Sequence, residues 1–274
     1  MTALQALNPF LLLAVARRHC ALLCQLTQRQ MAARYRGSTL GYLWMLSHPL
    51  LMLTIYTFVF GVVFKSRWGT DPNDSTGDFA VVMFCGMAVF NIFSETVNGC
   101  TQCVITNANL VKKVIFPLEI LPLAQLLSTT VLSLSWFVLL LAGALALGMR
   151  LTWTILLFPA LLLPLMLFSL GLGYFVAATT VYLRDMPHFT AIATQVLFFM
   201  TPIFYRIDMV PERLRFILLC NPLTPMVDQI RAVLLFGRPP DWQTCALLWL
   251  VSWFVCHLGL LWFLKTKKGF ADVL

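Results

Sequence analysis

The feature that most constrains this chain is a series of long stretches without a single Lys, Arg, Asp or Glu. A helix needs about 20 residues to cross the ~30 Å hydrocarbon core of a bilayer. Each stretch is at least that long, so each can form a membrane span. The five stretches are Gly37–Phe64, Ile120–Met149, Leu151–Leu183, Met186–Tyr205 and Trp242–Leu264.

A sixth stretch, Phe79–Val111, is interrupted only by Glu95. Of the 274 residues, 60% are hydrophobic and 11% are charged, whereas soluble proteins average roughly 45–50% and about 25%. These values exclude a soluble globular enzyme, and six spans leave no connection long enough for a separate soluble domain. The sequence therefore predicts an all-α polytopic membrane protein with one transmembrane domain over residues 1–274 and spans at 42–64, 79–103, 119–147, 153–181, 188–205 and 242–264.

The distribution of cations predicts the orientation of these spans. Six spans place both termini on one side, and cytoplasmic segments carry an excess of Lys and Arg, so both termini are predicted to be cytoplasmic. The arginines between residues 206 and 238 oppose this assignment unless they belong to packed structure. Although the net charge is +8, no basic stripe is interleaved with aromatic residues, and no nucleic-acid partner is expected. The cations on the cytoplasmic side would be Arg17, Arg18, Arg29, Arg34, Arg36, Lys112, Lys113, Arg184, Lys265, Lys267 and Lys268.

Three segments outside the spans have a pattern of their own. Residues 9–36 place arginines after an apolar run, the reverse of a secretory signal, and predict an amphipathic helix in the cytoplasmic interface. Residues 105–117 predict a short helix closed by Pro117, which is either a docking element for a soluble partner or an ordinary connection. Residues 211–237 contain two amphipathic runs broken at Asn221-Pro222, each too short to span, and predict re-entrant half-helices.

Four polar residues share one face of the second span. Asn91, Glu95, Asn98 and Gln102 are spaced by four, three and four residues, which aligns them along a helix. An ionisable group inside a span must face protein or water. This face predicts either a polar channel for a hydroxyl-rich sugar or a hydrogen-bonded seam between helices. Aromatic residues that could offer ring faces to such a sugar are Tyr56, Phe60, Phe90, Phe93, Phe198 and Tyr205.

Motifs for other chemistry do not complete a site. The sequence has no G-x-x-x-x-G-K-[ST] phosphate loop, so energy for transport must come from another subunit. Cys100 and Cys103 have the spacing of a redox motif, but they fall at the end of a hydrophobic span and favour simple packing. The four histidines are scattered, and no catalytic or metal-binding cluster is predicted.

Several ordered motifs resemble the permease subunit of type-2 ABC polysaccharide exporters, most closely the Wzm-like O-antigen exporters, with capsule and teichoic-acid permeases as relatives. The resemblance runs from about Arg34 to the C-terminus. The residues that carry it are Arg34-Tyr-Arg-Gly-Ser-Thr-Leu-Gly-Tyr-Leu-Trp44, His48-Pro-Leu, Phe116-Pro-Leu-Glu-Ile-Leu-Pro122, Tyr182-Leu-Arg-Asp185, Pro202-Ile-Phe-Tyr205, Asn221-Pro-Leu-Thr-Pro225 through Arg231, and Phe270-Ala-Asp.

The resemblance implies a homodimer in the bacterial inner membrane, two copies of a separate ATPase that bind ATP and Mg, and a lipid-linked glycan as cargo. The lipid is expected to be undecaprenyl diphosphate, and no cofactor is expected on this chain. The resemblance also implies that segment 105–117 is a coupling helix and that segment 211–237 forms gate helices. The residues expected to face the ATPase are Asn109, Lys112, Lys113, Val114 and Phe116.

Arg34 and Arg36 lie between the interface helix and the first span, where the phosphates of a lipid head group would be located. Guanidinium groups bind phosphate in bidentate fashion, although simple anchoring to the membrane would use the same charges. Two other functions fit the hydropathy: an ABC permease for a drug or small lipid-like molecule and, less well, a membrane-bound glycosyl- or acyltransferase.

Overall fold

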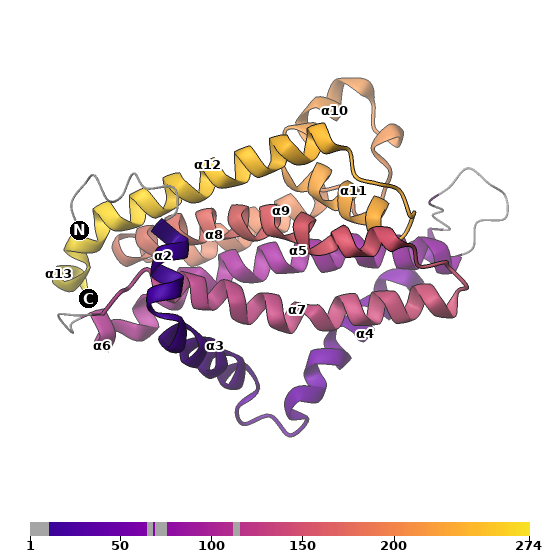
Figure 1. The fold of residues 1–274 in the computed structure, drawn as a ribbon. Coiled ribbons are helices and arrows are strands. Elements are labelled where there is room, and N and C mark those ends of the chain that lie inside the picture. Colours follow the sequence, from indigo (N-terminus) through magenta and orange to yellow (C-terminus); the bar gives the residue numbers. More distant parts are fainter. Residues whose placement is uncertain (1–10, 65–67, 69–75, 112–115) are drawn as a thin grey trace.

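The computed structural model describes residues 11–64, 68, 76–111 and 116–274, and this part of the chain is helical throughout, with turns and short connections. Four long helices run side by side and form the body of the molecule, and α7 runs in the opposite direction to the other three (Figure 1). Five helical segments are long and apolar enough to cross a membrane. The long helices are α5 (Thr76–Cys103), α7 (Ile120–Ala146), α8 (Phe158–Tyr182, preceded by the 3-10 turn η4, Trp153–Leu157) and α12 (Trp242–Thr266).

The fifth spanning segment is Gly41–Val63, which differs from the others in its geometry. It lies obliquely to the bundle (Figure 1), and only 11% of its 18 most apolar consecutive residues are buried. Its last turns form a π-helix, a wider geometry that is frequent at functional sites. The segment consists of η1 (Gly41–Leu43), α4 (Trp44–Tyr56) and η2 (Thr57–Val63).

The predicted span at 188–205 is shorter in the structure. Helix α9 (Met186–Met200) begins with Pro187 in its first turn and has 15 residues, or about 22 Å of helix, against the ~30 Å of a hydrocarbon core. It ends because Pro202 disfavours a helical backbone at Thr201. The other predicted spans agree with the observed helices to within a few residues.

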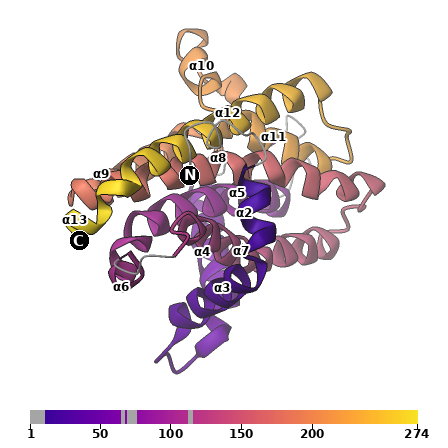
Figure 2. The same cartoon turned by 60° about the vertical axis from the view of Figure 1, so that its left-hand side comes forward.

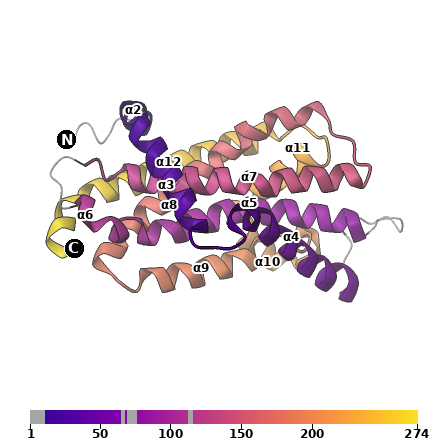
Figure 3. The same ribbon diagram turned by 90° about the horizontal axis from the view of Figure 1, so that it is seen from below.

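Helix α5 is the centre of the fold. Seen from below, it runs between α7 and α9 (Figure 3). Of its 18 most apolar consecutive residues, 83% are buried. Behind it, α8 and α12 cross at two glycines, where a Cβ added at Gly259 would lie 2.0 Å from the carbonyl oxygen of Gly171. Only glycine allows the two backbones to approach this closely.

The N-terminal segment forms two helices, α2 (Leu11–Arg18) and α3 (Cys20–Tyr35), rather than one helix over residues 9–36. Leu23 and Leu26 are buried, and Ser128 of α7 donates a hydrogen bond to Gln30 of α3. Arg17, Arg18 and Arg29 remain exposed. The apolar face of α3 thus packs on α7, and its cations face outward.

The 211–237 segment contains two short helices, as predicted. They are α10 (Glu212–Leu219), which follows the turn η5 (Ile207–Met209), and α11 (Leu223–Leu234). Asn221 makes the break between them: its side chain accepts a hydrogen bond from the Leu223 amide and donates one to Thr201. Such a local bond competes with helix continuation.

The opposite end of the bundle carries α6 (Ala108–Val111), the turns η3 (Ile105–Asn107) and η6 (Lys267–Gly269), and α13 (Phe270–Val273). Figure 2 brings this end forward. Lys267 donates to the Glu119 carboxylate at 2.6 Å, and Tyr182 donates to the Thr266 carbonyl. These bonds connect the C-terminal segment to the start of α7 and to the end of α8. The predicted 105–117 helix is helical through Val111, and residues 112–115 lie outside the described part.

Candidate functional site

The polar face predicted on α5 is present, and its residues contact three different helices. The Asn91 amide donates to the Ser133 hydroxyl of α7 at 3.1 Å. The Asn98 amide donates to the Thr194 hydroxyl of α9, also at 3.1 Å. Each bond joins two helices, as expected of a seam, yet Asn91 and Asn98 also line an open cavity. The two interpretations of this face therefore describe the same residues.

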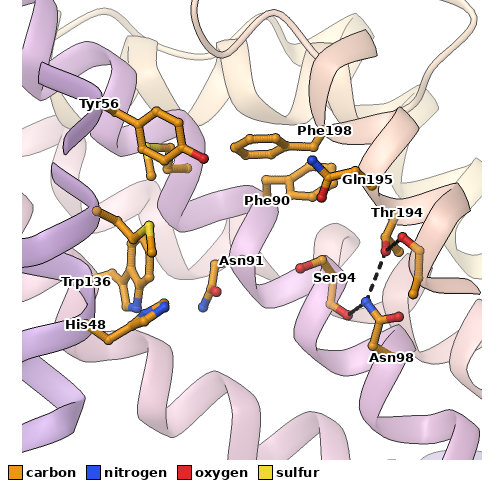
Figure 4. A pocket seen from close by; sticks show the side chains of 13 residues that line it. His48, Tyr56, Phe90, Asn91, Ser94, Asn98, Trp136, Thr194, Gln195 and Phe198 are labelled. Atoms are coloured by element: carbon orange, nitrogen blue, oxygen red, sulfur yellow. Dashed lines mark hydrogen bonds between the residues drawn. The ribbon is translucent and has the colours of Figure 1, made fainter. Parts of the chain in front are cut away.

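This cavity, of about 430 Å³, lies between α4, α5 and α9. In Figure 4, the rings of Tyr56, Phe90 and Phe198 lie together with the Gln195 amide, whereas Asn91, Ser94, Asn98 and Thr194 line another part of the cavity. The Tyr56 hydroxyl and the Gln195 amide both point into the space. Polar groups beside apolar rings are the combination that small-molecule and sugar sites use for orientation and contact area. The lining residues are His48, Met52, Tyr56, Met87, Phe90, Asn91, Ser94, Asn98, Trp136, Ala191, Thr194, Gln195 and Phe198.

An aromatic cluster closes the end of the cavity nearer to α10. Phe204 is its centre, with ring centroids 4.6 Å from Phe60 and 5.2 Å from both Tyr56 and Phe198. Phe90 joins through Phe198 at 5.1 Å. Tyr56, Phe60 and Phe198 therefore surround Phe204, and Phe90 contacts Phe198. Phe204 was not among the aromatic residues predicted from the sequence.

Two other predicted aromatic residues have different surroundings. Tyr205 is absent from the cavity lining, and its hydroxyl donates to the Phe199 carbonyl at 2.9 Å. Phe93 is 1% exposed and stacks on Phe168 at 5.9 Å. Phe93 therefore belongs to the core between α5 and α8.

Glu95 and Arg34 form an ion pair that joins two predictions made separately. The Arg34 guanidinium lies 2.9 Å from the Glu95 carboxylate, and the two side chains are 41% and 33% exposed. Arg34 therefore supplies the partner that an intramembrane carboxylate requires. Arg36 follows the end of α3 and is exposed.

Arg34 lines two further cavities on either side of this ion pair. One, of about 320 Å³, lies between α4 and α7 and includes Tyr35, His48 and Asn91. The other, of about 470 Å³, lies between α3, α5 and α7 and includes Gln102. All four residues of the polar face of α5 thus lie in or beside cavities. Figure 4 shows how His48 and Trp136 lie next to Asn91, where the first two cavities approach each other.

The residues predicted to face an ATPase are only partly described. Asn109 is exposed on α6, at the end of the bundle that also carries α13. Phe116 is partly buried and packs against the core. Lys112, Lys113 and Val114 lie outside the described residues.

Two of the arginines after α9, Arg206 and Arg231, are held by hydrogen bonds within the protein, whereas Arg213 and Arg238 are exposed. Arg231 is 2% exposed and donates to the carbonyls of Val82, Pro202 and Ile203 at 2.8–3.1 Å. Arg206 donates to the carboxylate of Asp208, and this bond lowers the pKa of that carboxyl. The guanidinium groups of Arg206 and Arg231 are thus fixed by partners within the protein.

The sequence analysis missed several residues of the site. Ser94 lies three residues after Asn91, so helical spacing alone could have added it to the polar face. Thr194, which is buried and lines the cavity, follows Thr190 on α9 by four residues and gave a similar signal. His48 and Trp136 gave no sign of a place at the cavity, because the packing of α4 on α7 brings them there. Phe204 joins the aromatic cluster only through the packing of the 201–205 segment.

Comparisons of the sequence with known proteins identify a family and several relatives. A family model described as ABC-2 type transporter matches residues 21–235. The chain is 27% identical over 257 residues to the O-antigen export system permease protein RfbA of Klebsiella pneumoniae, covering 92% of this chain and 95% of that protein. It is 35% identical over 226 residues to the RfbA of Myxococcus xanthus, covering 80% and 82%. It is 25% identical over 219 residues to the polysialic acid transport protein KpsM of Escherichia coli, covering 76% and 79%.

Proposed function

Because the chain belongs to the ABC-2 type transporter family, we propose that it is the membrane-spanning permease subunit of an exporter that moves a lipid-linked polysaccharide of the O-antigen type across the bacterial inner membrane. Relatives with 27% and 35% identity carry the name of O-antigen export permease. The observation that carries the proposal is the cavity between α4, α5 and α9, which is lined by amide groups and aromatic rings together.

The cavity chemistry supports a sugar as cargo. Sugar hydroxyls exchange hydrogen bonds with amides, and the apolar faces of sugar rings pack on aromatic side chains. Asn91, Asn98 and Gln195 provide the amides, while Tyr56 and Phe198 provide the rings. Gln102 and Glu95 extend the polar face toward the end of the bundle that carries α6.

A second copy of the chain would complete the path. The helices that flank the cavity, α4 and α9, present exposed apolar residues on their outward faces, among them Ile55 at 50% and Ile192 at 66% exposure. Two copies that face each other across these helices would enclose a conduit between them. A homodimer is therefore part of the proposal.

Energy would come from two copies of an ATPase subunit that bind ATP and Mg. Their docking site would be the bundle end with α6, where Asn109 is exposed, together with Lys112, Lys113, Val114 and Phe116. Apolar residues would pack against the ATPase, and the lysines would lie at the rim of the contact.

The same end would face the cytoplasm. Arg184, Lys265, Lys267 and Lys268 lie in the α8–α9 turn and the C-terminal helices, in agreement with the cytoplasmic bias of cations. The arginines of the opposite end weigh less against this orientation, because Arg206 and Arg231 are fixed by carboxylate or carbonyl oxygens.

Arg34 and Arg36 would bind the phosphates of the cargo lipid, probed most simply as undecaprenyl diphosphate. Support comes from the position of Arg34 at the mouth of two cavities and from its partial exposure. A phosphate would take the place that the Glu95 carboxylate occupies beside the guanidinium.

Gene deletion tests the function as a whole. We expect loss of surface polysaccharide and accumulation of lipid-linked glycan on the inner leaflet, both restored by the full-length chain. Unchanged surface polysaccharide in the deletion strain would contradict the proposed function.

Cysteine accessibility tests the path. Single cysteines at positions 91, 95, 98 and 102, in a background without the eight native cysteines, should react with a water-soluble thiol reagent. Complete protection of all four positions, both at rest and with ATP bound to the complex, would leave only the seam interpretation.

A further inference from the structure

Three of the motifs that carry the family resemblance meet at the bundle end with α6 and α13 (Figure 2). They contain Glu119, which precedes α7, Tyr182 at the end of α8, and Phe270 at the start of α13. The proposed function uses none of these three side chains. Their contacts nevertheless join α7, α8, α12 and α13 into one cluster.

Glu119 is held at two points. Its side chain is buried, and its carboxylate accepts a hydrogen bond from Lys267 at 2.6 Å. Its backbone carbonyl accepts a hydrogen bond from the Tyr174 hydroxyl at 2.8 Å. Tyr174 is fully buried on α8, and Lys267 directly follows α12. Because a buried carboxylate without its partner is costly, these bonds fix the start of α7 to α8 and to the end of α12.

Aromatic rings continue this contact toward the turn between α8 and α9. The ring centroid of Phe263 lies 5.4 Å from Tyr174 and 5.5 Å from Phe270, and Phe270 lies 6.0 Å from Tyr182. The Tyr182 hydroxyl donates to the Thr266 carbonyl at 2.8 Å. Since Phe263 and Phe270 are fully buried and protein interiors are closely packed, a shift of one ring displaces the next. We call the following residues the Glu119 cluster: Glu119, Tyr174, Tyr182, Phe263, Lys267 and Phe270.

The cluster lies between the 105–117 segment and α9. On one side, Glu119 follows that segment through buried turns: Leu118 is 4% exposed, and its carbonyl accepts a hydrogen bond from the Leu121 amide. On the other side, Tyr182 ends α8 just before α9 begins at Met186, and α9 flanks the 430 Å³ cavity. Chains of packed side chains carry energetic coupling between distant sites. The cluster therefore connects the 105–117 segment to a wall of the cavity.

We infer that Glu119 and Lys267 are positioning residues that transmit movement of the 105–117 segment through the Glu119 cluster to α9. The role of this segment as the docking site of an ATPase rests on the proposed function. With the pair intact, a displacement of the segment reaches the α8–α9 turn, from which α9 extends along the cavity. Without the pair, the ATPase still docks and hydrolyses ATP, but α9 no longer follows.

Lys267→Met and Lys267→Arg form a matched pair of variants. Lys267→Met removes the donor to the Glu119 carboxylate, whereas Lys267→Arg keeps a charged donor. Glu119→Met is a second variant that breaks the pair without leaving a buried charge, so it guards against a failure to fold. Asp241→Ala is the control for stability. It removes the cap at the opposite end of α12, where the Asp241 side chain accepts hydrogen bonds from the amides of Gln243 and Thr244.

The test uses the full-length chain in complex with its ATPase subunit. ATP hydrolysis and thermal unfolding are measured on the purified complex in nanodiscs, and surface polysaccharide is measured in cells that contain equal amounts of complex. In Lys267→Met and Glu119→Met, we expect ATP hydrolysis close to the wild-type rate and export lowered at least about fivefold, the lower end of typical coupling between two sites. Lys267→Arg should retain export. Asp241→Ala should unfold at a lower temperature and export normally.

Other results would overturn the inference. Normal export by Lys267→Met or Glu119→Met would restrict the pair to a role in stability, as would an equal loss of export in Asp241→Ala. Loss of the ATPase subunit from the complex of either variant would show that the pair belongs to the docking contact and not to transmission. Failure of the proposed function gives a different result, because cells with the wild-type chain and cells without the gene would then carry the same surface polysaccharide.

Discussion

The two sides of α5 differ in how tightly they are packed. On one side, α8 and α12 cross with their backbones in contact at Gly171 and Gly259. On the other side, cavities lie beside α4 and α9. Only 11% of the 18 most apolar consecutive residues of the α4 span are buried, against 83% for α5. A single helix thus carries an apolar face into a fixed scaffold and a polar face toward a space that other molecules can enter.

The difference indicates where movement is possible. Packed interiors have few discrete arrangements, while segments with few buried contacts open at low free-energy cost. We therefore expect α5, α8 and α12 to act as a scaffold and α4 and α9 to move more readily. Substitutions in the scaffold should therefore change stability most, and substitutions on the open side should change it least.

Arg231 should be the most sensitive residue of the scaffold. Arg231→Met would leave the buried carbonyls of Val82, Pro202 and Ile203 without their donor, at a cost of about 1–3 kcal/mol each. We expect a large fall in the thermal unfolding midpoint and in the yield of monodisperse protein. Arg213→Met removes the same charge from the exposed face of α10 and should change stability by no more than about 0.5 kcal/mol. Equal effects of the two variants would show that the three hydrogen bonds of Arg231 do not stabilise the fold.

The glycine crossing should tolerate no side chain. A Cβ in Gly259→Ala would lie 2.0 Å from the Gly171 carbonyl oxygen, and separation of the two helices should cost about 1–3 kcal/mol. Gly143→Ala is the control, because its Cβ has space and Ala is about 1 kcal/mol better than Gly within a helix. Thermal unfolding in detergent should therefore show opposite signs for the same substitution. A neutral Gly259→Ala would show that α8 and α12 are less closely packed than described.

Much of the scaffold could be predicted from the sequence, because hydropathy and charge-free length report membrane spans directly. The break at Asn221 and the polar face of α5 could also be predicted, because both are local patterns in the sequence. The contacts between residues far apart in the sequence could not be predicted. Nothing near Glu95 in the sequence indicates that Arg34 pairs with it, and nothing in the 201–205 segment shows that Phe204 lies among Tyr56, Phe60 and Phe198. The length of α9 was overestimated because hydropathy continues past Thr201, where the helix has already ended.

The Glu119–Lys267 pair links the scaffold to the segment that precedes α7. Glu119 is 7% and Lys267 is 30% exposed, so this hydrogen-bonded pair should contribute about 1–2 kcal/mol. In a double-mutant cycle of Glu119→Gln and Lys267→Met, we expect the second substitution to cost little once the first is present. Additive losses in thermal unfolding would show that the two side chains do not act together.

The Arg34–Glu95 pair on the open side should matter least for stability and most for transport. Both side chains are about one third or more exposed, so breaking the pair should change stability by no more than about 1 kcal/mol. Arg34→Lys keeps the charge, and with it the attraction to Glu95, but loses the fork that binds phosphate oxygens in pairs. We therefore expect Arg34→Lys to unfold at nearly the wild-type temperature and to export less polysaccharide, while Arg18→Lys on the exposed face of α2 exports normally. Glu95→Gln should separate the effects further, because it frees Arg34 for phosphate and should raise the affinity of the purified protein for undecaprenyl diphosphate. Full export by Arg34→Lys would reduce the role of Arg34 to a positive charge at the membrane surface.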